Sequence, residues 1–93
     1  MIIGVCTWQL HLDGCQSLKD KRHVLRSIKD RLRNQFNVSV SETDLQDTWQ
    51  QAELTVCVVS PDRTYAEGAL QAADRLVASA AGARIVDSAT SYL

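Results

Sequence analysis

Hydrophobic and polar residues follow two distinct periods along this chain. Period two, typical of a strand with one face on a core, occurs in residues 2–12, 36–41 and 54–59, whereas helical spacing of apolar residues occurs in 18–32 and 66–80. A weaker alternation over residues 84–92 predicts a last strand, in which Val86 faces inward and Asp87 outward.

Polar residues and glycines mark the ends of these elements. Ser17 is a candidate N-cap for the first helix, with Asp20 three residues later as a variant of the capping box, and this helix is expected to end near Asn34. Asp44–Gln51 is expected to connect the second and third strands. Gly82 is placed to stop the second helix.

The predicted order of elements is β-α-β-β-α-β, which is the ferredoxin-like arrangement of the α+β class. We therefore expect a four-stranded antiparallel sheet with two helices on one face, because right-handed crossovers bring both helices to the same side. The 93 residues suffice for one such domain, residues 1–93.

The face of the sheet that carries no helix is expected to be partly apolar. Ile3, Val5 and Val59 fall on it by alternation, whereas Thr7, Gln9, Thr55 and Cys57 make its centre polar. Since monomers seldom leave a sizeable apolar patch exposed, these three residues predict a homodimer interface. The centre lacks the aromatic side chains on which RNA-recognition domains of this fold stack bases.

Apolar content and cysteine usage indicate the cellular location of the chain. No run of 18 apolar residues is present, so no membrane span is expected. Three widely spaced cysteines favour free thiols and a cytoplasmic location. Cys6 is expected in the core and Cys57 on the open face. Cys15, in a loop before a basic helix, is either incidental or a thiol of lowered pKa.

Charge is distributed unevenly, although the formal net charge is only −1. Residues 17–34 hold seven of the ten Lys and Arg residues against two Asp, and the rest of the chain is acidic. Five of these cations recur at spacings of three and four and form a basic ridge on one helix face: Lys19, Arg22, Arg26, Lys29 and Arg33. Such a ridge suits RNA phosphates or an acidic protein surface, but solvated cations also flank the core stripe of many helices.

Other polar residues give weaker indications. Asp44 and Asp47 are spaced for a hard cation or acid–base work, but turn capping explains them more simply. Trp49 either packs over the sheet edge or contacts a partner. His11 and His23 are isolated, and no metal-binding, phosphate-loop or nucleophile motif is present. We expect no catalytic residue, no metal and no cofactor.

Three segments in order also resemble the YlxP-like family of uncharacterised bacterial proteins. They are Ser17–Arg22, Arg31–Val40 and Asp44–Gln50, and the likeness extends through Val56–Ser60. Asp20 and Asp13 depart from the family pattern, in which Glu and Pro are usual. The resemblance implies a ferredoxin-like fold and no established catalytic residues. It also implies a ribosome or RNA connection, because the family's genes typically lie among those for translation initiation and ribosome maturation factors.

Two functions follow as expectations. The first is a non-enzymatic accessory protein that binds structured RNA or the ribosome through the basic ridge. The alternative is a homo-oligomeric interaction module whose ridge meets an acidic protein.

Overall fold

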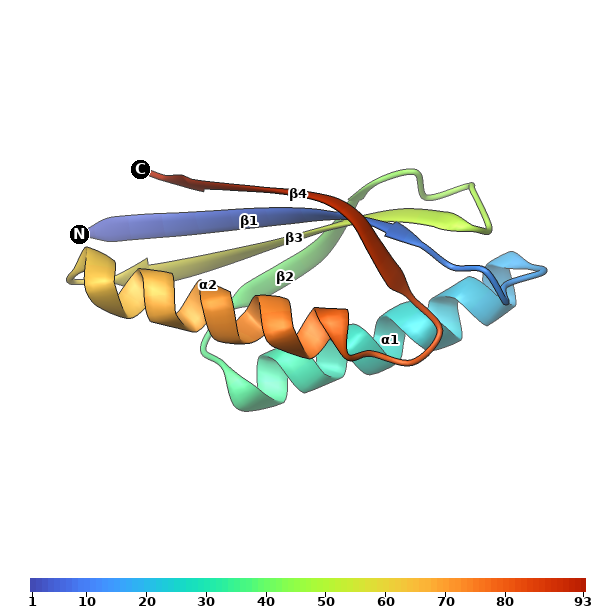
Figure 1. Cartoon of the computed structure of the whole chain (residues 1–93), viewed down its shortest axis with the longest axis horizontal. Coiled ribbons are helices and arrows are strands. Elements are labelled where there is room, and N and C mark those ends of the chain that lie inside the picture. The colour runs from blue at the N-terminus through green and yellow to red at the C-terminus, as the bar shows by residue number, and fades with distance from the viewer.

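The structure is a computed structural model that describes residues 1–93, with four strands and two helices. The elements are β1 (Ile2–His11), α1 (Leu18–Gln35), β2 (Ser39–Asp44), β3 (Gln51–Ser60), α2 (Arg63–Ala78) and β4 (Arg84–Tyr92). The strands form one antiparallel sheet in the order β2-β3-β1-β4, and both helices lie on one of its faces (Figure 1). The predicted ferredoxin-like fold is confirmed.

Both helices begin at residues whose side chains satisfy free backbone donors. The Ser17 hydroxyl accepts the Asp20 N–H at 3.1 Å, and the Asp20 carboxylate accepts the Gln16 N–H at 3.0 Å. In α2 the N-cap is Asp62, whose carboxylate accepts the Tyr65 N–H at 2.8 Å. Helix α1 therefore starts where the sequence predicted.

The start of β2 and the end of α2 differ from expectation. β2 begins at Ser39 rather than at residue 36, because Phe36 caps α1 through its N–H, which donates to Leu32 at 3.0 Å. Helix α2 ends at Ala78, before the predicted stop. Gly82 instead makes the turn into β4, with a φ of 84° that favours glycine.

One cluster of 19 buried residues fills the space between the sheet and the helices. The central β1 and β3 contribute alternate residues to it, and α2 adds mostly alanine and leucine. Trp8, at the centre of β1, is fully buried, and its indole N–H donates to the Asp74 carboxylate at 2.9 Å. This bond joins α2 to the sheet and satisfies a donor that burial would otherwise leave costly.

The predicted inward orientation of Val86 is wrong. β4 pairs with β1 in a register that shifts between Gln9 and Leu10, so that Ile85 lies opposite Leu10 and Asp87 opposite Gln9. Val86 is the extra residue of this bulge, and its side chain is 53% exposed. Ile85 packs against the core in its place.

Candidate functional site

The basic ridge lies along the exposed side of α1. Four of its five members line one groove of about 540 Å³: Arg22, Arg26, Lys29 and Arg33. Lys19 lies apart and lines a different concavity, with Gly14 and Gly82. The structure therefore groups four of the predicted residues and separates the fifth.

The opposite wall of this groove comes from β2 and the loop after it. Glu42, Gln46 and Asp47 line it, and Asp30 adds a carboxylate from α1 itself. A row of cations thus runs along the helical wall beside Asp30, and the other two carboxylates lie on the sheet side. A ligand with negative charge is attracted to the helix and kept from the hairpin.

The cations of the groove are not equally available. Arg33 donates to the Val40 carbonyl at 3.2 Å and lies 3.9 Å from Asp30, so it also supports the local structure. Arg22, Arg26 and Lys29 have no carboxylate within 4.0 Å in the structure. These three charges are free to meet a ligand.

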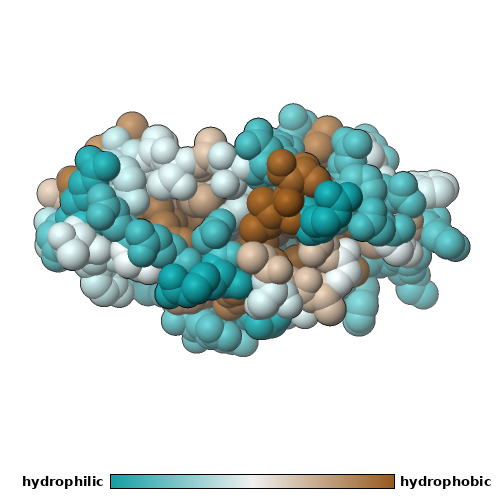
Figure 2. All heavy atoms as spheres, in the orientation of Figure 1, coloured by the Kyte–Doolittle hydropathy of each residue, from teal (hydrophilic) through white to brown (hydrophobic).

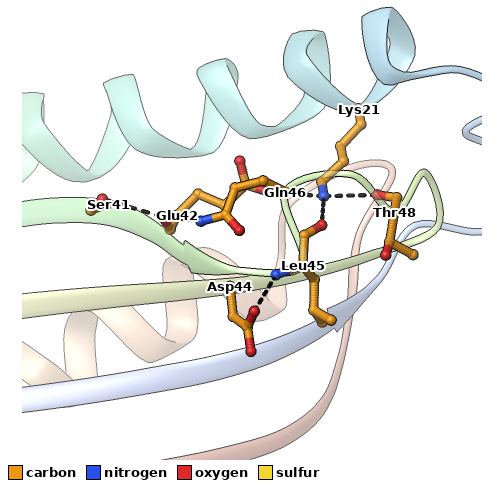
Figure 3. A network of polar contacts seen from close by, with 7 residues as sticks. All are labelled: Lys21, Ser41, Glu42, Asp44, Leu45, Gln46 and Thr48. Atoms are coloured by element: carbon orange, nitrogen blue, oxygen red, sulfur yellow. Dashed lines mark hydrogen bonds and ion pairs between the residues drawn. The ribbon is translucent and has the colours of Figure 1, made fainter.

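Lys21, in the same helix, has a role that the charge pattern did not reveal. Its side chain is only 2% exposed, and its Nζ donates to the carbonyls of Leu45 at 2.6 Å and Thr48 at 2.7 Å (Figure 3). Glu42 Oε2 lies 2.8 Å from the same nitrogen, as an ion pair without a directed hydrogen bond. The ammonium group thus donates two hydrogen bonds to loop carbonyls and its charge is balanced by Glu42, so Lys21 ties the β2–β3 loop to α1.

The loop that Lys21 holds contains an unusual backbone conformation. Leu45 has a φ of 64°, in the left-handed region that costs a residue with a Cβ about 1 kcal/mol or more. The Asp44 carboxylate accepts the Leu45 N–H at 2.8 Å, which makes Asp44 a turn cap. Asp47 is exposed and lines the groove. The two carboxylates therefore have separate surroundings.

Trp49 lies in this same loop and is 51% exposed. It does not belong to the buried core or to the residues packed against it. Half of the indole is therefore available for contact from outside. The structure leaves Trp49 as a candidate contact residue.

Ile3, Val5 and Val59 come together at one end of the open sheet face. Ile3 lies opposite Val59 and Val5 opposite Cys57 in the β1–β3 ladder. Val59 is 64% exposed, and Leu93, hydrogen-bonded to Ile3 through the backbone, is 76% exposed. This end of the face is an exposed apolar patch.

The rest of the open face is a ladder of polar side chains. The Thr55 hydroxyl lies 3.0 Å from that of Thr7 and 2.8 Å from that of Thr43, while Gln9 donates to Glu53 at 2.8 Å. These groups satisfy one another within the sheet. They therefore present no free row of donors to a ligand.

The cysteines lie where expected, except for Cys15. Cys6 is buried and Cys57 is half-buried on the open face, but Cys15 is also buried in the core cluster. Burial raises the pKa of the Cys15 thiol, and the nearby Asp20 carboxylate raises it further against the opposing effect of Lys21. The idea of a lowered pKa at Cys15 is wrong, because the loop folds inward.

Two further features were not found from the sequence. A second groove, of about 720 Å³, runs between α2 and β4, and its lining includes Cys6, Asp74, Ser88 and Thr90. At one end of this lining the Arg63 guanidinium lies 4.3 Å from the centre of the Tyr92 ring. The polar residues of β4 gave no hydrophobic period from which to infer this groove.

No group of three or more His, Cys, Asp or Glu side chains is arranged to hold a metal ion. His11 pairs instead with Asp13, at 2.6 Å. Neither helix has the length and apolar content needed to cross a membrane.

Solved structures with a similar backbone support the fold. One is a de novo designed protein with ferredoxin fold, with a TM-score of 0.51, 12% identity and coverage of 100% of this chain and 83% of that one. Another is a C-terminal segment of the alpha subunit of aIF2 from Pyrococcus abyssi, with a TM-score of 0.50 and 17% identity. This chain is covered completely in that match but spans only 49% of the other chain. At these identities the likeness concerns the fold alone.

Sequence comparison gives a closer relationship. The uncharacterised protein YlxP of Bacillus subtilis (strain 168) is 41% identical over 70 residues, which are 75% of this chain and 76% of the relative. A family model described as "Protein of unknown function (DUF503)" matches residues 3–90. The predicted YlxP-like resemblance is confirmed, and the chain belongs to the DUF503 family.

Proposed function

We propose that this protein is a non-enzymatic, cytoplasmic accessory protein that binds structured RNA through the groove along α1. The observation that carries the proposal is the row of Arg22, Arg26 and Lys29, which line one groove and have no carboxylate partners. Mutual repulsion of such a row costs stability unless the cations meet an anion. Phosphates of a nucleic acid supply that anion repeatedly along a line.

The chemistry of the open sheet face favours the helix over the sheet as the RNA contact. The centre of the open face carries hydroxyl and amide groups bonded to one another, and no aromatic side chain. Contact through α1 is therefore directed mainly at the backbone of the nucleic acid. Recognition of this kind depends on the shape of the RNA more than on its base sequence.

Ribosome co-sedimentation is the first experiment. The purified protein is mixed with ribosomes and pelleted at low and high salt, beside a variant with Arg22, Arg26 and Lys29 replaced by Gln. We expect the wild-type protein to pellet with ribosomes at low salt and to remain in the supernatant at high salt. Binding to phosphates releases counterions, so affinity falls as the salt concentration rises. A wild-type protein that stays in the supernatant at low salt, and binds no isolated ribosomal RNA, would refute the proposal.

A second candidate function is a homo-oligomeric module that binds an acidic protein. The exposed apolar patch at Ile3, Val5 and Val59 favours it, because such patches commonly mark interfaces. Val5→Asp and Val59→Asp are expected to dissociate an assembly formed through this patch. Sedimentation of these variants at matched concentration tests it.

A further inference from the structure

The two edges of the sheet differ in how their backbone groups are covered. On β2 the outward carbonyls are occupied, since Arg33 donates to Val40 at 3.2 Å and Gln46 donates to Glu42 at 3.3 Å. β2 is also short, with six residues, and lies beside the cations of α1. These are means by which proteins prevent an edge strand from pairing with another chain.

The outer half of β4 lacks such protection. Ile3 and Leu93 exchange two backbone hydrogen bonds, at 3.1 and 2.8 Å. In an antiparallel ladder, residues alternate between pairs that are hydrogen-bonded to each other and pairs that are not. Counting back from Leu93, the backbone groups of Tyr92, Thr90 and Ser88 therefore point away from β1. One of these groups is occupied, because the Ser88 N–H donates to the Asp87 carboxylate at 2.9 Å. Both groups of Thr90 and of Tyr92 have no partner among the hydrogen bonds of the chain.

The side chains of this segment also permit a close neighbour. Residues 88–93 include no charged side chain and no proline, and are small except at Tyr92 and Leu93. The strip of surface along this half of β4 is pale in Figure 2, which marks hydropathy near neutral. The bulge at Val86 and the charged Asp87 confine any pairing to residues 88–93.

From this difference we propose that a second copy of the chain pairs with β4 in antiparallel fashion, with Thr90 on a two-fold axis. Thr90 then faces Thr90 of the second copy and exchanges two hydrogen bonds with it. Tyr92 lies opposite Ser88 of the other copy, so its N–H donates to the Ser88 carbonyl, while the Ser88 N–H keeps its bond to Asp87. The result is an eight-stranded sheet with the four helices on one face.

Charge favours a second copy at this edge over pairing through β2. The charged residues that line the adjacent α2–β4 groove balance: Arg63, Glu67, Asp74 and Arg75. Two β4 edges therefore meet without net repulsion. Pairing through two β2 edges would bring together two rows of unpaired cations. Pairing of β2 with β4 would leave a free edge at each end of the assembly, which would continue into a filament. Pairing through β4 does not require RNA.

Sedimentation of Thr90→Pro tests the proposed pairing. The Thr90 N–H points away from β1, so proline there removes an intermolecular donor and no internal ladder bond. We expect a wild-type dimer and a Thr90→Pro dimer weakened roughly 10- to 100-fold, because the substitution removes both bonds at the axis. Val59→Asp would dissociate a dimer formed through the open face, and it is expected to leave a dimer formed through β4 intact.

A second measurement uses the wild-type chain alone. Hydrogen exchange at the Thr90 and Tyr92 amides is expected to slow as protein concentration rises, whereas in a monomer both amides exchange rapidly. A wild-type monomer at several hundred micromolar overturns the proposal. So does a dimer that Thr90→Pro leaves unchanged, or one that Val59→Asp dissociates, since the latter would use the open face.

Discussion

Lys21 Nζ lies 2.6 Å from the carbonyl oxygen of Leu45, so a buried cation from α1 holds a residue of left-handed backbone conformation in the β2–β3 loop. The same loop carries Trp49 and the Asp47 carboxylate that lines the α1 groove. One side chain therefore links the core-facing side of α1 to the wall opposite the basic ridge. Loss of this link should disturb both the stability of the fold and the shape of the groove.

Replacing Lys21 with Met tests the energetic side of this relationship. The apolar stem is kept, but the carbonyls of Leu45 and Thr48 and the Glu42 carboxylate lose their cation. We expect the free energy of unfolding to fall by about 3 kcal/mol, the lower end for breaking a buried pair, because Glu42 retains some solvent contact. Urea denaturation measures the loss.

The double variant Lys21→Met with Glu42→Gln is the control. If the unpaired carboxylate causes part of the loss, the double variant should be more stable than the Lys21→Met variant. A Lys21→Met protein as stable as wild type would contradict the role of Lys21 as a structural clamp.

Trp49 and Trp8 offer a matched comparison between an exposed indole and a buried one. Trp49→Ala should lower the free energy of unfolding by about 1 kcal/mol, well below the roughly 3–5 kcal/mol of a buried Trp, because half of the side chain is already in water. Trp8→Phe should cost about 1.5–3 kcal/mol through the lost bond to the Asp74 carboxylate. Thermal and urea melts measure both.

Partner binding then decides the role of Trp49. If the indole contacts RNA or a protein, Trp49→Ala should weaken binding while the protein stays folded. A loss of stability as large as that expected for a buried Trp would remove Trp49 from the candidate contacts.

The fold could be predicted because the strong hydrophobic periods of β1, β3 and both helices depend on local sequence alone. The errors arose where a long-range contact decides the outcome. Val86 is outward because a bulge in the β1–β4 pairing shifts the register, and no period within the strand encodes that bulge. Phe36 leaves the strand pattern because it caps α1.

Part of the candidate site could be predicted because helical spacing, like the hydrophobic periods, depends on local sequence alone. Helical spacing suffices to place Arg22, Arg26 and Lys29 on one side of α1, and the structure puts all three in one groove. The burial of Lys21 depends on the loop folding against it, which spacing alone does not reveal. Cys15 is likewise placed in a loop by the sequence, and only the folded loop shows that the side chain turns into the core.

The buried thiols predict a dependence of stability on pH. Burial raises the pKa of Cys15, so the folded chain holds this proton more tightly than the unfolded chain does. The resulting stability is fully present below the unfolded thiol pKa, about 8.5, and is lost as pH rises from there toward the folded value. Between pH 8 and pH 10, urea melts are expected to show a larger fall in the free energy of unfolding for wild type than for Cys15→Ala.

Thiol labelling provides an independent check of the same prediction. At pH 8 the half-buried Cys57 should react first with a small thiol reagent, and the buried Cys6 and Cys15 much more slowly. Equal rates at all three thiols, or equal pH dependence in wild type and Cys15→Ala, would contradict it.

The final prediction concerns the salt dependence of RNA binding, which separates a binding groove from a solvated helix face. Replacing Arg22, Arg26 and Lys29 with Gln nearly preserves helix propensity and should change the free energy of unfolding by no more than about 0.5 kcal/mol. Each lost phosphate contact removes about 0.7 to 0.9 from the slope of log affinity against log salt, so the slope should flatten by about 2 to 3. The control variant replaces Arg31, Arg75 and Arg84 with Gln. These three residues lie outside the groove, and the control removes the same total charge. A control that weakens binding equally would indicate only general attraction to the protein, and a groove variant with the wild-type slope would exclude α1 as the RNA contact.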